Sequence, residues 1–473
     1  MTERKRYLNT FCTVVFTGLL FFLFGSGYLR GEIYFKDSDR QLEVIRINGE
    51  QPGLTVLIFG GIHGDEPGGY FSSEILSKVK MIKGNLIVVP RVNFPSIMLY
   101  KRDLNGDLNR KFGDREKPGD PDIEIVKILK SLMKEADVFI NQHDAYGFHR
   151  ETFISPKYNY KMYGQSLIID CARFYSDKLK KQVELAQMGK SILERVNRQI
   201  SNKDHHFGFW DHDSVAHNTR FPEMKKSATY YALTTFSIPA FGLETSKDLP
   251  SLNDKVKYQL IVIREILHEF GLEGVFPSTD VATPEMYWIE FLKNNKDTVR
   301  VNPSTNLRLN SGDIIIIKNI VSNYDNGLSA DIMDWGSIND VDKEFRYSKP
   351  SVIQVKKNHL VMGKIFLQGF LKDSIREISV EVNGKKQVIP NWGKVEISRG
   401  ETFKILGTSP VLSQTRFDIR GFNAPGSIKD DSNIVISFEK LLPEYSFLKK
   451  GSVYFVKVYS GTQLTGGFQV EWH

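Results

Sequence analysis

A histidine and a glutamate three residues apart, His63 and Glu66, stand in the segment FGGIHGDEPGG at residues 59–69. An imidazole nitrogen and a carboxylate oxygen are common zinc ligands, and such a set leaves a position open for water. A His-x-x-Glu pair alone often arises by chance. Its place here carries more weight, because a buried-strand run, LTVLIF at 54–59, ends just before it and a helix is predicted to start at Pro67.

Two further residues are predicted to follow strands in the same way. His143 stands near the end of ADVFINQHD (136–144), and Glu244 stands near the end of SIPAFGLET (237–245). Ligands of open α/β sheets converge outside the carboxyl ends of the strands. We therefore expect His63, Glu66 and His143 to hold a metal with Glu244 nearby. A core histidine or an exposed glutamate explains these residues only one at a time.

The elements that must position these residues indicate an α/β domain. From Leu54 to about Leu272, strand-like apolar runs alternate with helical segments, which is typical of a largely parallel sheet flanked by helices. Predicted strands include 54–59, 85–89 and 136–140, and predicted helices include 69–79 and 122–135.

After about Pro277 the pattern changes to short β-branched runs separated by turn residues, which predicts all-β modules. Asn383-Gly384 is expected to form a hairpin turn, because this pair tolerates positive φ angles. We divide the chain into four parts. Residues 1–30 are a signal peptide or membrane anchor and residues 31–277 a catalytic domain. Residues 278–368 form a small β domain and residues 369–473 a β-sandwich-like domain.

Composition bounds the class of protein. With 41% hydrophobic and 25% charged residues, the chain reads as globular. Its two cysteines, Cys12 and Cys171, support neither a structural disulfide nor a cysteine zinc site. The net charge is +7, of which residues 1–30 supply +3, and no Lys/Arg block suggests a nucleic-acid partner.

The N-terminus resembles an export signal, because three basic residues at 4–6 precede the apolar run Phe11–Phe24 and the small residues at 25–27. Apolar character continues to Leu29, nearly long enough for an uncleaved anchor. We expect a periplasmic protein, either free or attached to the inner membrane through its N-terminus.

Four segments resemble a known family, the zinc metallocarboxypeptidases related to carboxypeptidase A and aspartoacylase. They are GGIHGDEPGG, RDLNGDLNRKF (102–112), NQHDAYGF (141–148) and FGLET (241–245), and they stand in the family's order within residues 50–250. The chain looks most like the periplasmic peptidoglycan DL-carboxypeptidases that determine helical cell shape. The resemblance implies a mixed, mostly parallel sheet, one zinc ion and cleavage of meso-diaminopimelate from a stem tripeptide to leave a dipeptide.

The resemblance also implies roles for single residues. Glu244 would be the general base, and Arg102 would stabilise the oxyanion. Arg110, assisted by Asn109, would bind the terminal carboxylate, which suits a planar guanidinium with several donors.

Two features depart from that pattern. Where the family commonly has an acidic residue two positions before the third ligand, this chain has Asn141, whose carbonyl could still accept an imidazole N–H, with Asp144 as a candidate replacement. The segment HHFGFWDHDSVAH contains four histidines and is a candidate rival metal site. We interpret it instead as a polar loop that contacts substrate; its histidines are His205, His206, His212 and His217.

Two other functions stay open. One is a small-molecule amide hydrolase of the aspartoacylase or succinylglutamate desuccinylase type, against which the export signal argues. The other is an inactive cell-wall binding scaffold, which ranks lower because Glu244 and the three predicted metal ligands are all present.

Overall fold

The computed structural model describes most of the chain from Leu29 onward. The described ranges are 29–36, 38–113, 118–335, 337–370, 375–412, 414–419, 421–422, 430–446, 451–461 and 463–473. The predicted leader, except for residues 29 and 30, and Cys12 lie outside them. Among the helices of the described ranges, none has the length and apolar character needed to cross a bilayer.

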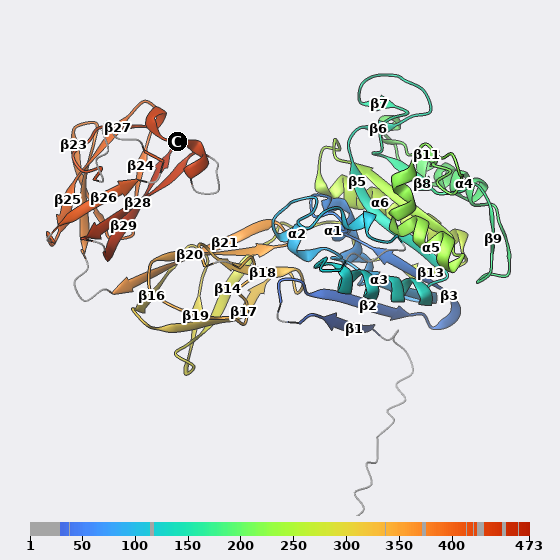
Figure 1. The fold of residues 1–473 in the computed structure, drawn as a ribbon, viewed down its shortest axis with the longest axis horizontal. Coiled ribbons are helices and arrows are strands. Elements are labelled where there is room, and N and C mark those ends of the chain that lie inside the picture. Colours follow the sequence, from blue (N-terminus) through green and yellow to red (C-terminus); the bar gives the residue numbers. More distant parts are fainter. Residues whose placement is uncertain are drawn as a thin grey trace, which may run out of the picture.

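The N-terminal part folds around a mixed sheet of nine strands (Figure 1). Its order is β1-β2-β4-β3-β5-β12-β8-β11, and β13 pairs with β4. The run β4-β3-β5-β12 is parallel, whereas β12 and β8 are antiparallel. The strands are β1 (Leu29–Tyr34), β2 (Leu42–Asn48), β3 (Gln51–Phe59), β4 (Lys80–Val89), β5 (Val138–Ala145), β8 (Ser166–Ile169), β11 (Gly208–Asp211), β12 (Ala240–Ser246) and β13 (Glu273–Val275).

Helices cover both faces of this sheet, because alternate residues of a strand point to opposite sides. On β3, Val56 and Ile58 join the core under α1, α4 and α6, and Leu57 and Phe59 join the core under α3 and α5. The mixed sheet with flanking helices confirms the predicted fold class. The helices are α1 (Pro67–Leu76), α2 (Phe94–Met98), α3 (Ile123–Glu135), α4 (Leu185–Arg198), α5 (Ala228–Phe236) and α6 (Leu252–Glu269).

Short elements complete this part of the chain. Two-stranded pairings join β6 to β7 and β9 to β10. These elements are β6 (Phe148–His149), β7 (Tyr158–Asn159), β9 (Phe174–Ser176), β10 (Lys181–Val183) and the 3-10 turns η1 (Leu108–Arg110), η2 (Lys203–His205) and η3 (Pro222–Lys226).

The next part of the chain forms two four-stranded sheets, β15-β14-β17-β19 and β16-β21-β20-β18. Ile289 of the first sheet and Ile353 of the second share one core, so the sheets pack as a sandwich. The strands are β14 (Met286–Lys293), β15 (Asp297–Val301), β16 (Asn306–Asn310), β17 (Ile314–Ser322), β18 (Leu328–Ile332), β19 (Glu344–Arg346), β20 (Ser351–Lys357) and β21 (Leu360–Phe370).

The C-terminal part repeats the sandwich arrangement with β23-β22-β25-β27 and β24-β29-β28-β26 around another core. Asn383 and Gly384, with φ of 47° and 78°, form the predicted hairpin turn between β22 and β23. The elements are β22 (Glu377–Val382), β23 (Lys385–Pro390), β24 (Lys394–Ile397), β25 (Thr402–Ser409), β26 (Thr415–Ile419), β27 (Ile436–Ser437), η4 (Phe438–Lys440), η5 (Pro443–Tyr445), β28 (Val453–Ser460) and β29 (Gln463–Trp472).

The turn between β20 and β21 joins the first sandwich to α1. The Lys357 ammonium, fully buried, forms an ion pair with the Glu74 carboxylate of α1. Two residues further along, His359 Nδ1 lies 2.8 Å from the Tyr70 hydroxyl, also on α1. The helix that follows His63 and Glu66 is therefore held by contacts with the first sandwich.

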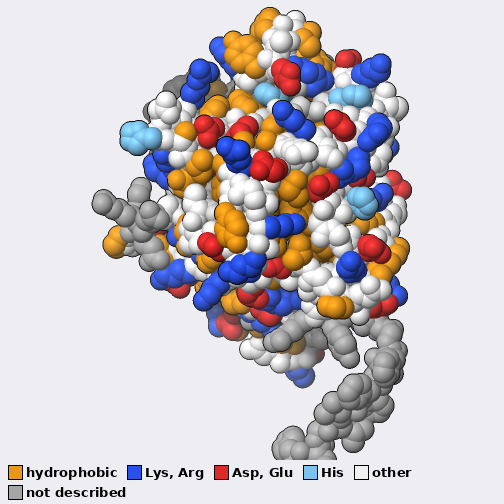
Figure 2. All heavy atoms as spheres, turned by 90° about the vertical axis from the view of Figure 1, so that its right-hand side faces the viewer, with side chains coloured by type: hydrophobic (Ala, Val, Ile, Leu, Met, Phe, Trp, Pro, Cys, Tyr) orange, Lys and Arg blue, Asp and Glu red, His pale blue; other side chains and the backbone are white. Residues whose placement is uncertain are grey.

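Charges are mixed on the surface of the N-terminal part. Figure 2 shows one face, on which Lys and Arg side chains are interspersed with Asp and Glu rather than gathered into one basic field. This face gives no sign of the basic stripe that nucleic-acid binding uses.

Candidate active site

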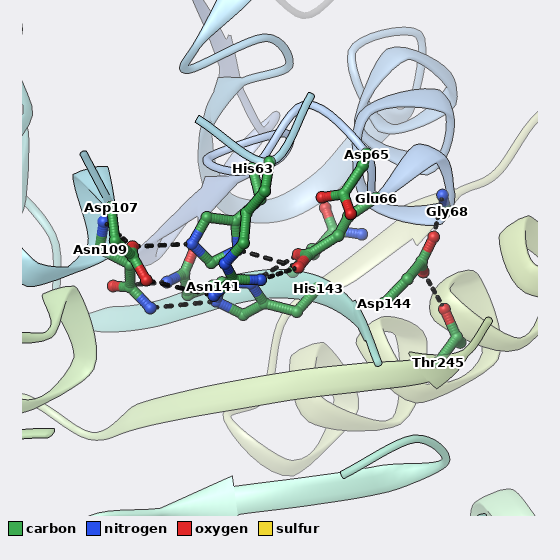
Figure 3. Close-up of polar contacts among 12 residues, drawn as sticks. His63, Asp65, Glu66, Gly68, Asp107, Asn109, Asn141, His143, Asp144 and Thr245 are labelled. Carbon is green, nitrogen blue, oxygen red and sulfur yellow. Dashed lines mark hydrogen bonds and ion pairs between the residues drawn. The ribbon is translucent and has the colours of Figure 1, made fainter. Parts of the chain in front are cut away.

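His63, Glu66 and His143 converge in the N-terminal part (Figure 3). All three are buried, and their candidate ligand atoms lie within 4.8 Å of one another. His63 Nδ1 is 2.9 Å from Glu66 Oε1, and His143 Nδ1 is 2.9 Å from Glu66 Oε2. Two imidazoles and a carboxylate therefore face one point.

The turn between β3 and α1 takes this shape because glycines permit it. Gly61 has φ of +69°, a conformation that side chains disfavour. At Gly64 a Cβ would lie 2.2 Å from the backbone of Ser96, so only glycine lets these two segments approach. The close fit brings His63 and Glu66 to the same side of the turn.

His143 and Glu244 lie within strands, and the prediction that each strand ends at these residues was wrong for both. β5 continues to Ala145 and β12 to Ser246. The parallel register pairs Glu244 directly with His143. Because neighbouring strands place paired residues on one face, Glu244 stands beside the ligand cluster.

Asp107 is a residue that the sequence interpretation missed. Its Oδ1 lies 2.9 Å from His63 Nε2, the nitrogen opposite the one that faces Glu66. A carboxylate in this place fixes the orientation of a ligand histidine and raises its basicity. Asp107 belongs to the RDLNGDLNRKF segment. The signal that could have identified it is an acidic residue two positions before Asn109.

Asn141 does not take the place of that carboxylate. Its Nδ2 is 3.4 Å from Asn109 Oδ1, and its own Oδ1 has no partner among the described residues. Asp144 does not compensate either. Its Oδ2 accepts the backbone N–H of Gly68 at 2.8 Å and its Oδ1 accepts the Thr245 hydroxyl, so Asp144 anchors the start of α1.

Glu244 and the three candidate ligands line one cleft, which has a volume of about 480 Å³. Its Oε2 is buried and has no hydrogen-bond partner in the described part of the chain. Burial, and then the nearby charges of Glu66 and Asp144, raise the pKa of Glu244 well above its usual value. A buried carboxyl group with a free oxygen beside the ligand cluster is a candidate for general acid–base catalysis.

Three residues of the RDLNGDLNRKF block line the cleft beside the ligand cluster, namely Arg102, Asn109 and Arg110. Arg102 Nη1 lies 2.9 Å from Glu66 Oε1, and Arg102 Nη2 lies 3.2 Å from Asp107 Oδ2. Asn109 Oδ1 accepts the backbone N–H of Ala228 at 3.0 Å, and its Nδ2 is 3.4 Å from His143 Nε2. Arg110 Nη1 donates to the Asn109 carbonyl at 3.0 Å.

The four histidines of 205–217 do not gather into a metal site. His205 Nδ1 lies 2.9 Å from the Tyr258 hydroxyl, and His206 Nε2 lies 2.9 Å from the Ile200 carbonyl. The segment contains β11 and is not simply a loop. Of its histidines, His212 lines the cleft.

The donor set fits a metal ion. Burial alone would lower the pKa of His63, but the charge of Glu66 raises this pKa to about 9. The buried Glu66 carboxylate therefore favours a cation beside it. A metal ion in the same place would meet that need, and two histidines with one glutamate suit zinc. The other grouping of metal-competent residues in the described ranges, Glu396, Glu471 and His473, is largely exposed.

Two family models match this chain. A family described as "Carboxypeptidase controlling helical cell shape catalytic" matches residues 36–280, and one described as "C-terminal domain of metallo-carboxypeptidase" matches residues 371–473. A search of curated protein sequences found no match.

Solved structures of the Helicobacter pylori cell shape determinant Csd4 have a similar fold. The apo form is 21% identical, and the match covers 91% of this chain and 100% of that chain with a TM-score of 0.53. The mDAP-bound form, described as a D,L-carboxypeptidase, is 21% identical over 89% of this chain and 97% of that chain, with a TM-score of 0.52. A tripeptide-bound form is 21% identical, with 91% and 100% covered and a TM-score of 0.53.

Proposed function

Since this chain belongs to the family of carboxypeptidases that control helical cell shape, we propose that it removes the C-terminal meso-diaminopimelate from the peptidoglycan stem tripeptide, leaving a dipeptide. The family makes the chain a metallocarboxypeptidase. The tripeptide and mDAP bound to Csd4, a protein of similar fold, support this substrate.

The proposed metal ligands are His63, Glu66 and His143, with zinc as the metal. A zinc ion held there would supply a Lewis acid and a water of lowered pKa. Asp107 would orient His63 through its Nε2. All three proposed ligands are buried side chains that line the cleft.

Glu244 is the proposed general base and acid. Its unpartnered Oε2 takes a proton from the attacking water and returns it to the leaving amine. The raised pKa of this carboxyl favours the first transfer, in which the carboxylate accepts a proton, and the pairing of Glu244 with His143 across the sheet supports a position beside the proposed ligands.

The arginine block would bind the charged parts of the substrate. Arg110, supported by Asn109, is the proposed partner of the C-terminal carboxylate, for which a guanidinium offers paired donors. Arg102 is half-exposed at the mouth of the cluster and is the proposed donor to the oxyanion of the tetrahedral intermediate.

The cellular setting is also part of the proposal. We place the leader at residues 1–30 and the three domains at 31–277, 278–368 and 369–473, and we expect periplasmic export because the substrate lies there. Peptidoglycan stem peptides are the expected partner.

The convergence of His63, Glu66 and His143 with Glu244 beside them carries this function. The test is to incubate the purified chain with stem tripeptide and identify the released residue by mass, with and without a metal chelator. Release of diaminopimelate that stops with chelator and returns with zinc is expected. Hydrolysis of an N-acyl amino acid but not of tripeptide would favour the amide hydrolase, and peptidoglycan binding without any cleavage would favour the scaffold.

A further inference from the structure

A second buried carboxylate, Asp170, lies in the candidate active site away from the metal ligands. It is 3% exposed and lines the same cleft as Glu244 and Arg110. Neither metal binding nor the proton transfers at Glu244 use it. An aspartate is almost never fully buried unless its charge is paired, so the question is which cation pairs with it.

The sheet register gives the spacing between the two levels of the sheet that carry these carboxylates. β12 and β8 are antiparallel, with Glu244 opposite Ser166 and Gly242 opposite Ile168. Asp170 is the first residue after β8, and the same register places it opposite Ala240. Four residues of strand separate this level from Glu244, roughly 13 Å along the sheet at about 3.3 Å per residue.

Apolar residues are part of the lining of the cleft. Ile168, Gly242 and Met224 line it. Gly242 has no side chain to fill the space above the sheet, and even a Cβ there would touch only Ile168, at 3.5 Å. This stretch suits the methylene groups of a long side chain that enters from the metal end and reaches toward Asp170.

His212 stands beside Asp170 at the far end. β11 pairs with β8 in parallel, Asp211 opposite Ile169, so the next residues along, His212 and Asp170, are neighbours. His212 is 4% exposed, lines the cleft, and its Nε2 has no partner among the described residues. Burial lowers the pKa of His212 to about 3, so this ring is neutral.

Asp170 has polar support but lacks a close countercharge. Burial raises the pKa of its carboxyl, while the hydroxyls of Ser214 and Thr229 and the more distant charge of Arg110 lower it. Among the described residues no lysine or arginine forms an ion pair with it. A ligand cation at this place would relieve the cost of the buried charge.

We propose that Asp170 and His212 form a subsite for the far end of the C-terminal residue's side chain, where Asp170 accepts a hydrogen bond from a second amino group. His212 Nε2 is the polar atom for the carboxyl that a diamino dicarboxylic acid carries beside that amine. This assignment rests on the proposed function. It selects C-terminal residues with a second amino group at the far end of a chain of methylene groups.

The test compares two tripeptides that differ in one group. One ends in meso-diaminopimelate, and the other ends in 2-aminopimelate, which has the same chain and carboxyl but lacks the second amine. For the wild-type chain, kcat/KM is expected to fall by a factor of about 10 to 100 without the amine, as for a lost hydrogen bond to a charged group. Equal rates on the two peptides would overturn the proposal even without a variant.

The substitution Asp170→Asn sharpens the comparison. It is expected to lower kcat/KM about 10 to 100-fold on the diaminopimelate peptide, mainly through KM, and to leave the aminopimelate peptide nearly unchanged. Asp213→Asn is the matched control, because Asp213 is exposed just after β11 and its φ of 44° suits asparagine equally.

The outcomes separate the subsite from the enzyme itself. If Asp170 only held the local fold, Asp170→Asn would slow both peptides by the same factor, and the subsite would be rejected. If the wild-type chain cleaved neither peptide in the presence of zinc, the proposed function would fail. Cleavage of both without a preference for the amine would leave the function standing and remove the subsite.

Discussion

His63 Nε2 lies 2.9 Å from Asp107 Oδ1, a contact between residues 44 positions apart. Asp107 Oδ1 also accepts the backbone N–H of Asn109 at 2.9 Å. The loop that orients a candidate metal ligand is thus continuous with η1, which carries Asn109 and Arg110. The proposed metal binding and the proposed binding of the substrate carboxylate therefore depend on one short segment.

Asp107→Asn should weaken zinc binding about 10 to 100-fold, because the amide cannot supply the negative charge that raises the basicity of His63. Competition with a chromophoric chelator measures the affinity. Asp103→Asn, four residues earlier in the same segment, serves as the control. Unchanged affinity in the Asp107 variant would mean that this carboxylate acts only in local folding.

Glu244→Gln should lower kcat on the stem tripeptide by a factor of about 10² to 10⁴ and leave the zinc content intact. The amide keeps the size of the side chain but cannot take a proton from water. Steady-state kinetics and metal analysis of the same preparation check both parts. Exposed Glu223→Gln is the matched control, and zinc loss in the Glu244 variant would indicate a ligand role instead.

Arg110→Lys should reduce the preference for a free C-terminal carboxylate. A lysine keeps the charge but loses the paired donors of the guanidinium, and such a change is not conservative at a carboxylate site. We expect kcat/KM on the free tripeptide to fall at least about 10-fold, while slow cleavage of the C-terminal amide hardly changes. Equal loss on both peptides would place Arg110 outside the carboxylate site.

Lys357→Met should alter how stability depends on pH. Burial lowers the pKa of Lys357 from 10.5 to about 7. The charge of Arg91 also lowers this pKa, whereas the charge of Glu74 raises it. Between these pH values the unfolded lysine holds more protons than the folded one, so the free energy of unfolding rises with pH in the wild-type chain.

The variant chain lacks this contribution from Lys357, so its stability relative to wild type should fall as the pH rises from about 7 to about 9.5. Urea unfolding of the full chain at several pH values, followed by circular dichroism, measures the difference. Lys349→Met, at an exposed position, should show no such trend. A constant difference between wild type and the Lys357 variant would contradict the lowered pKa.

Much of the fold and part of the site were accessible from residue patterns. The alternation of apolar runs predicted the mixed sheet, and the Asn383-Gly384 turn lies where its residue types put it. His63 and Glu66 are three residues apart, so the local chain brings them together. The predicted ends of β5 and β12 were wrong. Buried polar residues such as Gln142 can continue a strand when they have hydrogen-bond partners, here Ser72 and Gln259.

The sequence by itself determined the residue types of a metal site, the local His63–Glu66 pair and the change from α/β to all-β structure. Only the tertiary structure decided which carboxylate reaches His63, that Glu244 pairs with His143, and that Asp170 and His212 meet at the far end of the cleft. The physical reason is strand register. A shift of one residue turns a side chain to the other face, and residue spacing along the chain does not specify that register.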